Sequence, residues 1–158
     1  MWLSDRRGFL LAALALAGCG FTPVHGNSDK FDKLRNAVLV QAPTNRVEFE
    51  LVRNLEVQLG QVAAKSYDLH YTLSVSEEIV VISAAQEINR YGIVGLLEYS
   101  LVDSDGVILL SETAKSFTGY SATGTTVATQ RSKRDAYDRL MVILAKQVSN
   151  FLLASDRP

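Results

Sequence analysis

Hydrophobic and polar residues recur along the chain with two different periods, and the changes of period mark its elements. Residues 37–40, Ala-Val-Leu-Val, form a short apolar run before Pro43, which is typical of a buried strand. Asn45 and Glu48 have the spacing of a helix capping box. The apolar positions that follow recur at helical spacing and predict an amphipathic helix that ends near Lys65. Its expected buried face consists of Val47, Leu51, Val52, Leu55, Leu59, Val62 and Ala63.

From residue 69 the period changes to two. Apolar and polar residues alternate over 69–76, which predicts a half-buried strand that extends toward Ile82. Residues 89–102 and 107–120 predict two further strands. The sequence Asp-Ser-Asp-Gly at 103–106 lies between them and predicts a hairpin turn, in which the glycine supplies the positive φ. These three strands form a predicted antiparallel meander.

Residues 127–154 predict a long final helix after a polar loop at 121–126. The element order β-α-β-β-β-α predicts an α+β fold, a two-layer sandwich with a four-stranded mixed sheet and both helices on one face. The first strand is expected to join the meander as a parallel neighbour through a right-handed crossover. The expected apolar face of the final helix consists of Tyr137, Leu140, Leu144, Val148, Phe151 and Leu152. The residues expected to share one core are Leu55, Leu59, Leu73, Tyr99, Leu140 and Leu144.

The amino-terminal residues follow a different pattern. Arg6 and Arg7 precede an uncharged apolar run at 8–17, and small residues follow it. This combination predicts a secretory signal peptide. The run is too short for a membrane-spanning helix, which needs about 20 apolar residues. The segment Asp-Arg-Arg-Gly-Phe-Leu at 5–10 also resembles a twin-arginine signal, although Asp5 stands where Ser or Thr is usual. Both the general export route and the twin-arginine route therefore stay open.

Cys19 is the only cysteine of the chain and cannot form an internal disulfide. Residues 16–19, Leu-Ala-Gly-Cys, resemble the lipobox of bacterial lipoproteins, in which the chain is cut before the cysteine. In that family the thiol carries diacylglycerol and the new amine is acylated, and two or more acyl chains anchor a protein stably. The alternative is an ordinary signal peptide with a chance cysteine at its junction.

The lipobox resemblance implies a division of the chain. Residues 1–18 are the expected signal peptide, 19–36 the lipidated amino terminus and tether, and 37–158 a single α+β domain. Gly20 follows the cysteine in place of Asp, which by resemblance to enterobacterial lipoprotein sorting favours the outer membrane.

Composition and motifs exclude several function classes. Removing two arginines and one aspartate with the signal peptide changes the net charge from −1 to −2, so the basic excess of a nucleic-acid-binding protein is absent. His25 and His70 lack metal-ligand spacing, and neither a nucleophile elbow nor a P-loop occurs. Glu77 and Glu78 point to opposite faces of a strand, which is typical of a solvated edge or kink. We therefore expect no enzyme, metal site or cofactor.

The first third of the final helix is basic, which is the unfavourable end for the helix dipole. Its basic residues are Arg131, Lys133, Arg134 and Arg139. Arg131 and Arg134 lie three residues apart on one helix face and can meet a phosphate group. The alternative is a solvated face on which Asp135 and Asp138 are the partners. Arg90, in the second strand of the meander, is a further candidate for a phosphate contact. The alternative is that Arg90 is an ordinary surface residue.

Three stretches of the chain resemble the LptE-type family of LPS-assembly lipoproteins. Residues 19–24, Cys-Gly-Phe-Thr-Pro-Val, resemble the Cys-Gly-[Phe/Trp]-x-Pro-[Leu/Val] start of that family. Residues 90–109 resemble its strand-turn-strand signature, and residues 127–139 the last helix of its alphaproteobacterial branch. The chain departs from the family at His25, where Tyr or Arg is frequent, and at 84–89, which lacks the basic residue of some members.

The resemblance implies a function. Such lipoproteins plug the lumen of a large outer-membrane β-barrel protein, assist its folding and help pass lipopolysaccharide to the outer leaflet. It implies a lipid-anchored protein that faces the periplasm and the barrel lumen. If lipopolysaccharide is contacted, Arg90, Arg131 and Arg134 are the residues expected to bind its phosphates. The alternatives are an auxiliary lipoprotein of an ABC-type lipid transport system and a periplasmic enzyme domain.

Overall fold

The structure, a computed structural model, describes residues 34–82 and 88–155. The predicted signal peptide, Cys19 and residues 19–33 of the tether lie outside the described residues. The elements are β1 (Val38–Val40), α3 (Arg46–Leu59), β2 (Tyr67–Ile82), β3 (Ile88–Asp103), β4 (Ile108–Ser121) and α4 (Thr126–Ala154). The four strands form one sheet in the order β1-β2-β3-β4.

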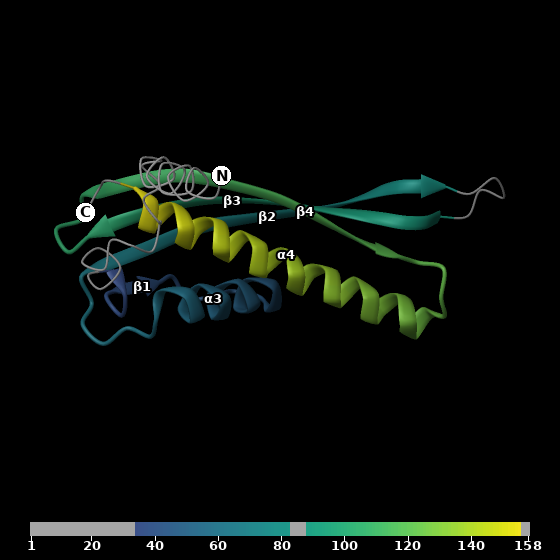
Figure 1. The fold of residues 1–158 in the computed structure, drawn as a ribbon, viewed down its shortest axis with the longest axis horizontal. Helices are drawn as coiled ribbons and strands as arrows, with labels where there is room; N and C mark the ends of the chain where they lie inside the picture. The colour runs from purple at the N-terminus through teal and green to yellow at the C-terminus, as the bar shows by residue number, and fades with distance from the viewer. Residues whose placement is uncertain (1–33, 83–87, 156–158) are drawn as a thin grey trace, which may run out of the picture.

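The sheet is mixed, as the sequence predicts. β1 pairs with the first residues of β2 in parallel, and the pairs β2–β3 and β3–β4 are antiparallel. Figure 1 shows both helices on the same side of the sheet. The predicted β-α-β-β-β-α sandwich is therefore confirmed.

The capping box that begins α3 is present with one variation. The Asn45 side-chain oxygen accepts a hydrogen bond from the Glu48 backbone N–H at 3.0 Å. The Glu48 carboxylate accepts hydrogen bonds from the Thr44 backbone N–H and the Asn45 side-chain amide, both at 2.7 Å. The carboxylate thus reaches one residue farther back than in the usual box, and it orders the chain that enters the helix.

The predicted end of this helix near Lys65 is wrong, because α3 ends at Leu59. Gly60 has a φ of 84° and donates its N–H to the Glu56 carbonyl at 2.8 Å, which closes the last turn. The chain then folds back, and the Ala63 N–H bonds the Asn36 carbonyl at 2.8 Å. A glycine tolerates this left-handed conformation and so ends the helix.

The turn between β3 and β4 follows its sequence signature. Asp103 accepts hydrogen bonds from the backbone N–H groups of Asp105 and Val107 through one carboxylate oxygen, both at 2.9 Å. Gly106 has a φ of 82°. An aspartate that bonds its own turn and a glycine in the left-handed region fix the hairpin.

Element length decides which part of the sheet is covered. The 16 residues of β2 span about 53 Å, whereas the 14 residues of α3 span about 21 Å. Figure 1 shows α3 beside one end of the sheet only, while α4 runs along most of its length. We call the end with β1, α3 and the 103–107 turn the proximal end. The end formed by residues 79–82 and 88–91 is the hairpin end.

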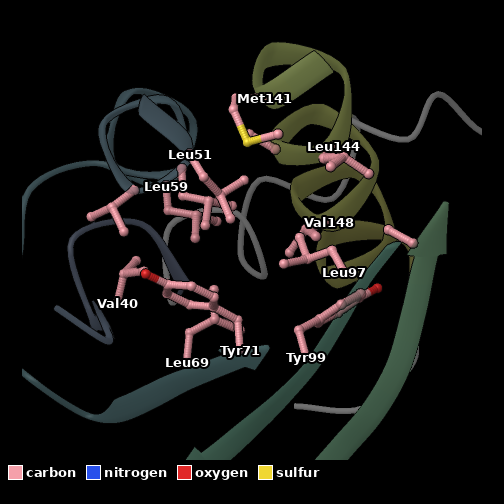
Figure 2. Close-up of a cluster of buried hydrophobic side chains, with 14 of the residues drawn as sticks. Val40, Leu51, Leu59, Leu69, Tyr71, Leu97, Tyr99, Met141, Leu144 and Val148 are labelled. Carbon is pink, nitrogen blue, oxygen red and sulfur yellow. The ribbon is translucent and has the colours of Figure 1, made fainter. Parts of the chain in front are cut away.

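The hydrophobic core lies between the sheet and both helices, toward the proximal end (Figure 2). Five of the six residues expected in the core are buried, and Leu73 is partly buried against them. Phe151 was expected on the apolar face of α4, and this is wrong, because it is 40% exposed. Met141 and Ala145 are fully buried in its place. The contact face of α4 therefore runs along the other side of the Leu140–Leu144–Val148 stripe.

Gly95 permits the close approach of α4 to the sheet. It is buried in β3, and a Cβ atom there would lie 3.0 Å from the side chains of Leu140 and Leu144. A larger residue would press on these two leucine side chains, which would have to shift to make room.

Candidate functional site

The candidate site is the first third of α4, where the basic residues cluster. Thr125 caps the helix, and its hydroxyl oxygen accepts a hydrogen bond from the Ala128 N–H at 3.3 Å. The first turn contains no acidic residue that would complement the helix dipole. The four basic residues lie in different surroundings, which the sequence could not distinguish.

Lys133 is bound to the sheet. Its ammonium group lies 2.6 Å from the Glu77 carboxylate, and the Tyr120 hydroxyl donates a hydrogen bond to the other oxygen of that carboxylate. Glu77 and Glu78 do lie on opposite faces, but Glu77 is half-buried against α4. The interpretation of Glu77 as part of a solvated edge is therefore wrong. On the sheet face beneath α4, its carboxylate contacts the Lys133 ammonium and the Tyr120 hydroxyl.

This contact shifts the pKa values of all three groups. Burial by itself raises the pKa of Glu77, but hydrogen bonds from Lys133 and Tyr120 outweigh it, so the pKa lies below its ordinary value. The hydrogen bond to Glu77 raises the pKa of Lys133. Burial, and then the hydrogen bond to Glu77, raises the pKa of Tyr120. The pair is therefore charged at neutral pH.

Aromatic rings surround the ion pair. The rings of Tyr91 and Tyr120 stack with centroids 5.1 Å apart and an interplanar angle of 11°. The Lys133 ammonium lies 5.9 Å from the centroid of the Tyr137 ring. A stacked pair contributes about 0.5–1.5 kcal/mol beyond its buried area. This cluster of Glu77, Lys133, Tyr91, Tyr120 and Tyr137, which we call the tyrosine cluster, joins α4 to β2, β3 and β4.

The remaining basic residues differ from one another. Arg139 donates a hydrogen bond to the Gly119 carbonyl at 3.2 Å, so it is engaged with β4. Arg131 and Arg134 are exposed, and within the described ranges neither forms an ion pair with Asp135 or Asp138. The interpretation of the aspartates as their partners is therefore not supported for these two residues.

Two adjoining hollows follow the first third of α4. One is a groove between α3 and α4 with a volume of about 370 Å³. It is lined by Arg46, Val47, Glu50, Gln130, Lys133, Arg134, Tyr137, Asp138 and Met141. The other, of about 500 Å³, lies at the start of α4 and is lined by Thr126, Val127, Gln130, Arg131 and Arg134. We call them the α3–α4 groove and the α4 hollow.

The structure brings two of the three predicted arginines together. Arg131 and Arg134 both line the α4 hollow. Arg90 is exposed and lies in β3 beside Tyr91, which faces the helices, so the alternation of the strand directs Arg90 to the opposite face. Contact of these residues with lipopolysaccharide stays a prediction. Sequence reasoning missed Arg46, because only the packing of α3 against α4 places it in the same groove as Arg134.

The sheet face opposite the helices is mainly polar. Its exposed polar residues include His70, Thr72, Ser74, Ser76, Glu98, Ser111 and Thr113. Apolar exceptions on this face are Phe117, which is 78% exposed, Val80 and Leu96.

Within residues 34–82 and 88–155 no group of histidine, cysteine or carboxylate side chains is arranged to hold a metal ion. In the same ranges no helix has the length and apolar character that a membrane span needs.

Comparisons with solved structures find the same fold in other bacterial lipoproteins. A putative lipoprotein from Caulobacter crescentus superposes with a TM-score of 0.65 at 19% identity, over 80% of this chain and 94% of that one. A minor lipoprotein from Acinetobacter baumannii superposes with a TM-score of 0.56 at 16% identity, over 77% of this chain and 92% of that one. The rare lipoprotein B of Shewanella oneidensis superposes with a TM-score of 0.52 at 11% identity, over 74% of this chain and 89% of that one. We found no match among curated proteins.

The sequence itself carries a family signature that covers most of the described fold. Residues 35–152 match the family described as LptE, lipopolysaccharide-assembly. This range begins just before β1 and ends within the last turn of α4, so it includes every described strand, all of α3 and nearly all of α4. The chain therefore belongs to the LptE family of lipopolysaccharide-assembly proteins.

Proposed function

We propose that this protein is a non-catalytic plug and folding aid for a large outer-membrane β-barrel protein that transports lipopolysaccharide to the outer leaflet. The family match over residues 35–152 is the observation that carries the proposal, because it assigns the chain to lipopolysaccharide assembly. The barrel partner and the site of action are inferred from the resemblance of the sequence to lipoproteins of this kind.

The surface of the domain supports the proposal. The interior of a large membrane barrel is polar and wet. The outer sheet face, with polar side chains such as Thr72, Glu98 and Thr113, suits such a lumen. The elongated sheet and the long α4 that runs along it give the domain the shape of a rod rather than of a sphere (Figure 1).

The anchor is a separate element of the proposal. We infer from the lipobox that Cys19 carries acyl chains and holds the domain at the outer membrane, with the domain facing the periplasm and the barrel lumen. Replacing Cys19 with Ala should give an uncleaved or soluble species. Intact-mass analysis of the mature chain tests this, and a mature chain without acyl mass would contradict it.

A crosslinking pull-down from outer membranes tests the function. The acylated protein should recover a large β-barrel protein, and depletion of the lipoprotein should lower the level of folded barrel and leave lipopolysaccharide short of the outer leaflet. Recovery of an inner-membrane ATPase assembly without any barrel would instead favour an auxiliary lipoprotein of an ABC-type transport system.

A further inference from the structure

The α3–α4 groove has a composition that plugging a barrel does not by itself require. Its floor is apolar and consists of Val47 and Tyr137, above the fully buried Met141. Its rim carries charges of both signs from the two helices. The groove exists because the first turns of α3 lie beside the first half of α4, so the sequence alone does not show it.

Two of the rim charges are already compensated. The Glu50 carboxylate lies 2.9 Å from the Arg53 guanidinium, and the Lys133 ammonium is bound to Glu77. Arg46, Arg134 and Asp138 have no ion pair within the described residues. The groove therefore offers two available guanidinium groups and one available carboxylate above an apolar floor.

This arrangement fits carboxylates better than a phosphorylated headgroup. A guanidinium binds either anion in a bidentate manner. Asp138, however, repels a phosphate with up to two negative charges more strongly than a single carboxylate, and it can accept hydrogen bonds from peptide N–H groups. The volume of about 370 Å³ holds on the order of twelve water-sized groups, which corresponds to a few amino-acid side chains.

We propose that the α3–α4 groove docks an acidic peptide segment of a partner protein, whose carboxylates bind Arg46 and Arg134 and whose aliphatic or aromatic side chain lies on Val47 and Tyr137. Burial of an apolar anchor with complementary charges around it is a recurrent mode of peptide recognition. The identity of the partner rests on the proposed function, in which the segment belongs to the β-barrel.

The acids between the predicted lipidation site and the first described residue do not supply this segment. Between residues 19 and 33 the acids are Asp29 and Asp32. The next residue, Leu34, lies near the end of α3 remote from the groove, since Asn36 bonds the Leu59 carbonyl at 2.9 Å. The groove is one length of α3 away, about 21 Å. Asp29, five residues before Leu34, reaches at most about 17 Å.

Arg46→Glu and Lys146→Glu form a matched pair for the test, because Arg46 lines the α3–α4 groove and Lys146, on α4, lies outside both hollows. Both side chains are exposed, and a glutamate at the first position of α3 suits the helix dipole, so both variants should fold. Equal melting temperatures verify this. The barrel is then recovered from outer membranes with the wild type and with each variant.

We expect Arg46→Glu to lower the barrel recovered by about tenfold, because a charge reversal turns attraction into repulsion, and Lys146→Glu to leave it unchanged. A photo-crosslinker at Gln130 should join a barrel peptide with at least two carboxylates. The same crosslinker at Lys146, which is exposed on α4 outside both hollows, should not.

Several outcomes overturn the inference. Full recovery by all three proteins would remove the groove from the interface and leave the proposed function standing. No recovery even by the wild type would overturn both. Competition by dodecyl phosphate for the Gln130 crosslink at low concentration, without competition by an acidic peptide, would show that the groove binds a phosphorylated amphiphile instead.

Discussion

The two ends of the sheet are held to the helices by different forces. Along the helix-facing side of β2 the side chains become more exposed from the proximal end to the hairpin end: Leu69 is fully buried, and Ile79 is 53% exposed. At the proximal end, leucines from α3 and α4 exclude water from the sheet. Toward the hairpin end, where α3 is absent, the tyrosine cluster joins α4 to the strands. The protein thus combines two parts. We call the leucine core between the sheet and both helices the block, and the part joined by the tyrosine cluster toward the hairpin end the arm.

This difference suits a protein that works against a partner surface. The proximal end contains the buried leucines of α3, whereas the first third of α4 presents polar and charged side chains around two hollows. If the first third of α4 were buried in an apolar core, it would present no charged side chains to a partner. The stability of the domain and its proposed contacts are therefore separated along the same helix.

Leu140→Ala should have the largest effect, because it opens a cavity in the block. Leu140 is fully buried against Gly95, so we expect a loss of about 2–5 kcal/mol in the free energy of unfolding. Denaturant melts measure this. Lys146→Ala, exposed on the same helix, is the control and should stay within about 0.5 kcal/mol. Equal effects of the two would mean that the helix face is wrongly assigned.

Gly95→Ala tests whether close approach, and not only buried area, holds α4 to the sheet. The added methyl group would lie 3.0 Å from Leu140 and Leu144, so we expect a destabilisation of about 1–3 kcal/mol. Thermal melts measure it. A stabilised variant would show that the helix moves aside without cost, and would remove the distinction between a rigid block and a looser arm.

Lys133→Met examines the arm. It leaves the half-buried Glu77 without its cation and should cost about 1 kcal/mol or less at pH 7, since Lys133 is more than one third exposed. The pKa of Glu77 lies below its ordinary value of 4.5, so the contribution is present above pH 4.5 and lost as the pH falls through the folded-state pKa. The wild type should therefore lose its advantage over the variant in acid. A difference that is constant down to pH 2 would contradict this.

Arg131→Glu combined with Arg134→Glu should change stability least, within about 0.5 kcal/mol, because both side chains are exposed. If these arginines contact lipopolysaccharide, a binding titration with the purified glycolipid should show a clear loss. Lys146→Glu, exposed on α4 outside both hollows, serves as the comparison. Unchanged binding in the double variant would assign these residues to the solvated surface and leave the plug proposal intact.

Local sequence determined much of this protein. The period of two over residues 69–76, the Asp-Ser-Asp-Gly turn and the Asn45–Glu48 cap each depend on neighbours in the chain, so their structures could be predicted. The order of elements then leaves few topologies, because a strand that precedes a helix joins the next strand in parallel. The same local reasoning could have predicted that α3 ends before Gly60, because a glycine often follows the last residue of a helix.

Only the tertiary structure decided what each charged residue does. Lys133 and Arg134 are adjacent in sequence, yet Lys133 is paired with Glu77 and Arg134 is not, because the position of β2 under α4 selects between them. Arg46 and Arg134 share a groove although 88 residues separate them in the sequence. Backbone periodicity reports which face of an element is apolar. Charge pairing depends on distances between elements, and those distances are set when the leucines of both helices close over the sheet.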